Sequence, residues 1–181
     1  MSYPIEKKLV VAVSSSALFD LSESHAVFVE QGPKAYKEFQ KRNLDKVLEK
    51  GVAFPFIKRF LQINQRFPDK EPVEVVLLSR NSAATGKRVF RSIQHYGLDI
   101  SRAAFMEGKS PYEYIPAFNA SLFLSANAED VQNAIDSGYP GGVVLPSKRI
   151  KDDDHAELRI AFDFDGVIAD DEAEAVLQLR S

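Results

Sequence analysis

The sequence contains no cysteine, so disulfide bonds, thiolate zinc sites and a cysteine nucleophile are excluded. It also has no excess of positive charge, because 23 Lys and Arg residues face 26 Asp and Glu residues, and the formal net charge is −3. The chain therefore lacks the basic field that nucleic-acid-binding proteins use, and we expect no nucleic acid partner.

Long hydrophobic runs are missing as well. The apolar segment nearest the N-terminus, Leu9–Val13, runs directly into three serines and is too short for a signal-peptide core or a membrane span. We therefore expect a cytoplasmic protein with no membrane contact. Hydrophobic residues still make up 45% of the chain, which is enough for a substantial core.

Short apolar segments alternate with segments of helical character. The expected strands are 9–13, 73–78, 103–106, 121–124, 143–145 and 158–162. Helices are expected from Gly32-Pro33 to about 50, after Pro55, at 84–96, and from a cap at Asn127 to 138. This alternation predicts an α/β fold, in which helices cover both faces of a parallel sheet.

Ligands of such sheets bind at the carboxyl ends of the strands. The polar turns expected there provide the candidate site residues: Ser14–Ser16, Ser79–Ser82, Ser125–Asp130 and Asp163–Asp165. Hydroxyls and backbone N–H groups at 79–82 suit a phosphate, although a plain polar strand-to-helix turn is the slightly favoured interpretation. Lys109 has the charge to neutralise a phosphate, or it is simply an exposed lysine.

Three further clusters are expected to be structural. The basic residues at 87, 88 and 91 are expected on a solvated helix face, and the phenylalanines at 54, 56, 60 and 67 are expected in the core. The acidic run at 152–154 is expected to be a solvated linker.

The pattern of the first strand recurs near the end of the chain. Val10–Leu18 aligns with Arg159–Val167 at a constant offset, since 163 minus 14 and 165 minus 16 both equal 149. The S-x-S of the first copy falls where the second has D-x-D, at Asp163 and Asp165. Two buried strands can look alike by chance, but a tandem duplication explains the constant offset.

The D-x-D pair has chemical consequences. On a strand both side chains point the same way, and their repulsion is relieved by a cation or by a proton on one of them. Carboxylate oxygens suit magnesium, which often completes its shell with water and substrate phosphate. One carboxylate can also attack phosphorus while the other transfers protons. The alternative is that the pair only ends a strand and caps the next helix.

The string DFDGVIADDE resembles the first motif of the haloacid dehalogenase-like phosphohydrolases. VEVVLLSRN resembles the second motif, in which Ser79 takes the place of the phosphate-binding Ser or Thr, and Lys109 falls where the third motif has a lysine. The resemblance implies a Rossmann-like sheet, with Asp163 as nucleophile, Asp165 as general acid/base, and both as magnesium ligands. The chain departs from the family pattern by lacking acidic residues at Ser14, Ser16, Ser125 and Asn127.

Nearly all of the chain, including AVSSSALFDL, GVAFPFIK, EVVLLSRNSAATGKRVFRSIQHYGLDI and RIAFDFDGVIADDEAE, resembles the cytosolic type I 5'-nucleotidases. This resemblance implies magnesium-dependent hydrolysis of nucleoside 5'-monophosphates, typically AMP and IMP, by a protein with two haloacid dehalogenase-like halves. Residues 1–150 would form a degenerate first unit, 151–156 a linker, and 157–181 the first strand and helix of an incomplete catalytic unit.

Three functions remain open at this point. The first is a 5'-nucleotidase whose site is completed by a missing C-terminal half or by a second copy in a homo-oligomer. The second is a non-catalytic module that binds a nucleotide or mediates oligomerisation. The third is a rearranged single-domain phosphatase, in which the last strand enters the first sheet beside Ser79 and Lys109, although the strand at 9–13 already claims that place.

Overall fold

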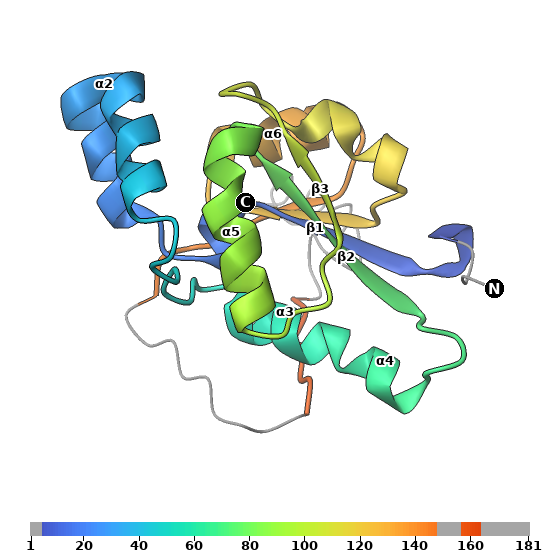
Figure 1. Ribbon diagram of the computed structural model, residues 1–181. Helices are drawn as coiled ribbons and strands as arrows, with labels where there is room; N and C mark the ends of the chain where they lie inside the picture. The colour runs from blue at the N-terminus through green and yellow to red at the C-terminus, as the bar shows by residue number, and fades with distance from the viewer. Residues whose placement is uncertain (1–4, 148–156, 164–181) are drawn as a thin grey trace, which may run out of the picture.

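The computed structural model describes residues 5–147 and 157–163, and these residues form a five-stranded sheet (Figure 1). The strands are β1 (Leu9–Val13), β2 (Val73–Ser79), β3 (Arg102–Phe105), β4 (Leu122–Ser125) and β5 (Gly141–Val143). They lie in the order β3-β2-β1-β4-β5, and every pairing is parallel. The strands predicted between residues 9 and 145 are confirmed, with ends shifted by two residues at most.

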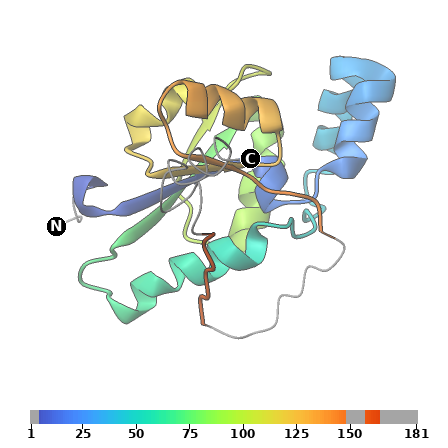
Figure 2. The same cartoon turned by 180° about the vertical axis from the view of Figure 1, so that it is seen from behind.

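Helices cover both faces of this sheet, which confirms the predicted α/β class. They are α1 (Ser15–Leu18), α2 (Ser22–Arg42), α3 (Phe54–Leu61), α4 (Ile63–Arg66), α5 (Ala83–His95) and α6 (Ala128–Asp136), with 3-10 turns η1 (Ile5–Lys7), η2 (Tyr112–Tyr114) and η3 (Pro116–Phe118). Helices α3 and α5 share one face, and α6 lies on the other, as the view from behind in Figure 2 shows. Among the described residues, no helix has the length and apolar character that a membrane span requires.

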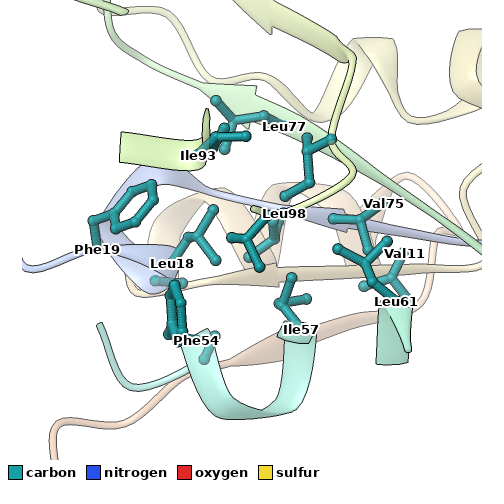
Figure 3. Close-up of a cluster of buried hydrophobic side chains, with 14 of the residues drawn as sticks. Val11, Leu18, Phe19, Phe54, Ile57, Leu61, Val75, Leu77, Ile93 and Leu98 are labelled. Carbon is teal, nitrogen blue, oxygen red and sulfur yellow. The ribbon is translucent and has the colours of Figure 1, made fainter. Parts of the chain in front are cut away.

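The central strands are buried on both faces because alternate residues enter two separate cores. In the larger core, shown in Figure 3, Val11 and Leu77 pack with side chains of α3 and α5. In the smaller core, Val10 and Val76 pack with α6 and with the segment 112–120. Burial on both faces explains why the sequence of these strands is continuously apolar rather than alternating.

Helix α2 differs from the prediction at both ends. It begins at Ser22, well before Gly32, and ends at Arg42 rather than near residue 50. At Gly32 the backbone takes a φ of 80°, so two helical halves meet at a kink there. Beyond Arg42 the chain makes tertiary hydrogen bonds instead, as where the Leu48 N–H donates to the Ser92 hydroxyl. Figures 1 and 2 both show α2 projecting beside the sheet.

The prediction that the phenylalanines at 54, 56, 60 and 67 all lie in the core also needs correction. Phe54, Ile57 and Phe60 are buried, whereas Phe67 is 52% exposed. Helix α3 ends at Leu61 and α4 is a separate short helix, so the helical period does not extend as far as Phe67.

The prediction of a strand at 158–162 is wrong. In the structure, residues 157–163 have no regular secondary structure. Leu158 packs against the larger core, but Ile160 is 50% and Phe162 is 67% exposed. A strand needs neighbours for its backbone hydrogen bonds, and β1 already occupies the place between β2 and β4. The helix predicted to follow, together with Asp165, lies outside the described residues.

Candidate functional site

The carboxyl ends of the strands bring together the polar turns that the sequence singles out. From β1 the chain continues to β2 and β3 on one side and later to β4 and β5 on the other, so the connections diverge at β1. In doubly wound sheets such a switch point is where ligands bind. The turns after β1, β2 and β4 contain Ser14–Ser16, Ser79–Ser82 and Ser125–Asp130 respectively, and the sheet order places all three at one edge.

Buried hydroxyls join the ends of β1 and β2. The Oγ atoms of Ser15 and Ser79 lie 2.8 Å apart, and the Asn81 side-chain amide donates to Ser15 Oγ at 3.2 Å. The backbone N–H of Asn81 donates to Ser79 Oγ at 3.1 Å. Ser79, the predicted phosphate ligand, is 1% exposed and shares its hydroxyl with these groups.

The structure assigns different roles to the three serines after β1. Ser14 caps α1, because its hydroxyl accepts from the Ala17 N–H, while Ser16 is exposed. Ser15, between them, makes the buried contact with Ser79. The alignment with D-x-D singles out the outer two serines, whereas the middle one is predicted only as a member of the polar turn 14–16.

Helix α2 is tied to this edge by a chain of polar side chains. The Tyr36 hydroxyl donates to the Asn81 side-chain oxygen at 2.8 Å, and the Gln40 amide donates to the Tyr36 oxygen at 3.1 Å. Burial raises the pKa of the Tyr36 phenol above its ordinary value, which keeps this hydrogen-bond donor protonated. The second half of α2 is therefore held against the ends of β1 and β2.

Arg88 extends this network and corrects a prediction. It was expected on a solvated helix face, but it is 3% exposed, and its guanidinium donates to the Lys46 carbonyl and the Gln40 side-chain oxygen. Desolvation lowers the pKa of Arg88. Lys87 and Arg91 are exposed as predicted. Helical periodicity cannot reveal the burial of Arg88, because the groups that satisfy it come from a distant segment.

A second polar cluster spans the edge from β2 to α6. Arg80 donates from Nε to both carboxylate oxygens of Asp130, at 2.9 and 3.0 Å, and from Nη2 to Oδ1 at 2.6 Å. The Ser110 hydroxyl donates to the same carboxylate, and Glu129 lies 3.3 Å from Arg80 Nη2. Hydrogen bonding to Asp130 is the main reason why the pKa of Arg80 is raised. Both ends of this pair fall in the predicted turns, but nothing local indicates that they meet.

The remaining predicted site residues are less enclosed. Lys109 is exposed, in a loop held to the β2 turn by hydrogen bonds from Met106 N to Ser79 O and from Gly108 N to Arg80 O. Asp163 is also exposed, at the end of the segment 157–163. Within 5–147 and 157–163, no three His, Asp or Glu side chains gather in a way that suits a metal ion.

This fold and this edge define a doubly wound α/β domain whose candidate site lies at a topological switch point. Comparison with known sequences is more specific. The model of the 5'-nucleotidase family matches residues 1–181, and the chain belongs to this family. The predicted family is thereby confirmed.

One relative is the human protein cytosolic 5'-nucleotidase 1B. It is 33% identical over 171 residues, which cover 92% of this chain and 28% of the human protein. Two structures of the HAD domain of effector protein Lem4 from Legionella pneumophila, one of them an inactive mutant, resemble this chain at TM-scores of 0.46 and 0.44. Their sequence identities are 12% and 11%, and the matches cover 79% of this chain and 88% and 89% of those chains.

Proposed function

We propose that this chain is part of a magnesium-dependent 5'-nucleotidase that hydrolyses nucleoside 5'-monophosphates, AMP and IMP, to nucleoside and phosphate. The observation that carries the proposal is family membership over residues 1–181, a range that includes Asp163 and Asp165. The name of the human relative, cytosolic 5'-nucleotidase 1B, supports both the substrate class and a cytoplasmic location.

In the proposed reaction, a carboxylate oxygen of Asp163 attacks phosphorus, and the bond between phosphorus and the 5'-oxygen breaks. Asp165 gives its proton to the leaving 5'-oxygen of the nucleoside. Asp165 then takes a proton from the water that attacks the aspartyl-phosphate. The water oxygen leaves with the phosphate, and both carboxyl groups return to their starting states.

The available donors fit magnesium. Asp163 and Asp165 offer hard carboxylate oxygens, and the chain has no thiolate that would favour a softer ion. When bound there, magnesium would offset negative charge on the phosphoryl oxygens. We propose that water, the substrate phosphate and protein groups outside the first unit complete the coordination of the ion.

We further propose that residues 1–150 form a complete but non-catalytic unit. Residues 151–156 link it to the catalytic unit, which begins with residues 157–181. The five-stranded parallel sheet within 5–147 supports the first part, as do the serines where the catalytic motif has aspartates. A rearranged single-domain phosphatase would need the segment at 157–163 inside this sheet. That segment is not a strand, and β1 holds the central place.

The test is phosphate release from AMP and IMP, with magnesium and with chelator, by the 181-residue chain and by a longer chain that includes the following unit. We expect release only from the longer chain, only with magnesium, and not after Asp163→Asn. Asp153→Asn in the linker is the matched control and should keep the activity. Equal rates for the longer chain and its Asp163→Asn variant would contradict the proposal.

A further inference from the structure

We propose that the carboxyl edge of the first unit contains an oxyanion-binding site that the protein fills with its own carboxylate, Asp130. The site would otherwise take a tetrahedral oxyanion, either free orthophosphate or the phosphate group of a monoester. This inference concerns residues 5–147 and does not depend on the reaction proposed for Asp163.

Arg80 presents its guanidinium to Asp130 through both Nε and Nη2, at 2.6–3.0 Å, which is the fork arrangement that also binds phosphate oxygens. Ser110 adds a hydroxyl donor to the same carboxylate. The Asp130 oxygens thus occupy the position where an external oxyanion would meet the same donors.

The pair of Arg80 and Asp130 lies at the switch point of the sheet. Arg80 follows β2 and Asp130 lies in α6, which follows β4, while β1 runs between these two strands. The ion pair therefore joins the elements on either side of the switch point. In an open α/β sheet this is the place where an anionic ligand is expected.

Burial and the local charge balance favour Asp130 over an external anion. The Asp130 side chain is 3% exposed and that of Arg80 is 34% exposed, so the carboxylate is enclosed while the guanidinium still reaches solvent. Glu129 adds a second negative charge 3.3 Å from Nη2, and the Gly108 carbonyl accepts from Nη1 at 3.5 Å. The acidic side chains outnumber Arg80, so an incoming phosphate is repelled while Asp130 is in place.

Ser79 belongs to the same edge but faces inward. Its hydroxyl is engaged with Ser15 and with the Asn81 N–H, which leaves Arg80 and Ser110 as the donors of the filled site. The alternative to this proposal is that Ser79 and Lys109 bind phosphate in the wild-type protein. The experiment below distinguishes these two hypotheses.

The experiment is calorimetric titration of the full 181-residue chain with orthophosphate, in chelator, so that a magnesium site at Asp163 does not contribute. We expect no saturable binding to the wild type up to about 10 mM, and at least about tenfold tighter binding to Asp130→Ala. Glu129→Gln with Asp130→Ala should bind as tightly or more tightly, because no second carboxylate can move onto Arg80. Glu129→Gln alone is the matched control and should not gain binding.

Arg80→Gln combined with Asp130→Ala should lose the gained binding, which places it at the guanidinium. Titration with AMP separates the two ligand sources, since a monoester site binds AMP at least as well as orthophosphate. If Asp130→Ala does not fold by circular dichroism, Asp130→Asn keeps the size of the side chain and removes its charge. Folded variants that bind no more phosphate than the wild type would overturn the proposal. So would saturable wild-type binding that Ser79→Ala or Lys109→Ala abolishes.

Discussion

Two segments of this chain share a sequence pattern and differ in structure. At β1 an apolar run followed by S-x-S forms the central strand, and its residues 10–13 are at most 3% exposed. At 157–163 an apolar run that leads into D-x-D forms no strand and leaves Phe162 67% exposed. Strand β1 pairs with β2 and β4, whereas the described part of the later segment pairs with no strand. The apolar pattern thus specifies which side chains a strand can bury, but the strand forms only where neighbouring strands pair with it.

The sharpest test of this comparison uses the same substitution in both settings. Ile57, in α3, is fully buried in the larger core, whereas Ile160 is 50% exposed. We expect Ile57→Ala to lower the free energy of unfolding by about 2–5 kcal/mol, because it removes buried methylene groups and leaves a cavity. Ile160→Ala should change it by less than about 0.5 kcal/mol. Urea denaturation followed by circular dichroism measures both.

Equal costs at the two positions would break the comparison. That result would mean that the segment 157–163 is packed as firmly as the body of the sheet in solution. A small cost at Ile57 would instead show that α3 does not close the larger core.

A second pair of variants compares the buried and exposed hydroxyls at the carboxyl edge. Ser79→Ala removes a partner of Ser15 Oγ and the acceptor of the Asn81 N–H, and we expect a loss of about 1–3 kcal/mol in unfolding free energy. Ser16→Ala changes an exposed serine and should stay within about 0.5 kcal/mol. If Ser79→Ala is as mild as Ser16→Ala, the hydroxyl cluster does not help to close this edge.

The smallest expected effect is a pH dependence. Burial raises the pKa values of Tyr36 and Tyr96 in the folded protein, so the unfolded chain ionises these phenols first, near pH ~10. Their contribution to stability is complete below that pH and is lost as the pH rises toward the folded-state pKa. We expect Tyr36→Phe to flatten the fall in unfolding free energy above pH ~9.5.

Because Tyr36→Phe also removes the hydrogen bond to Asn81, stability should drop by a constant amount at all pH values, and only the slope reports on ionisation. Tyr96→Phe is the control, since it should remove its own share of the slope and leave that of Tyr36. An unchanged slope in Tyr36→Phe would mean that α2 does not bury this phenol in solution.

Local sequence patterns predicted a large part of this fold. Continuous apolar runs located the strands between 9 and 145 because such runs are buried on both faces of a parallel sheet. The cap at Asn127 is confirmed, since its side chain accepts from the Asp130 N–H, three residues ahead. The helix predicted at 84–96 is confirmed as well, since α5 spans Ala83–His95 and buries Val89 and Ile93. Each of these features depends on residues close together in the chain.

The predictions that were wrong concern features that depend on residues far apart in the chain. The end of α2, the burial of Arg88 and the absence of a strand at 158–162 all depend on partners distant in sequence. The Leu48 N–H is satisfied by Ser92, and Arg88 by the carbonyl of Lys46. Where a distant contact satisfies a backbone or charged group, it overrides the structure that the local helical or strand-like pattern predicts for that group.

By itself the sequence determined the α/β class, the polar turns at the strand ends and membership of the 5'-nucleotidase family, because these reside in local patterns and motifs. Only the tertiary structure decided that Ser15 rather than Ser14 or Ser16 meets Ser79, and that Arg80 is held by Asp130. The physical reason is that a side chain's partner depends on which turns the sheet brings together. That choice is made by the order of the strands, over separations of 64 residues for the two serines and 50 for the ion pair.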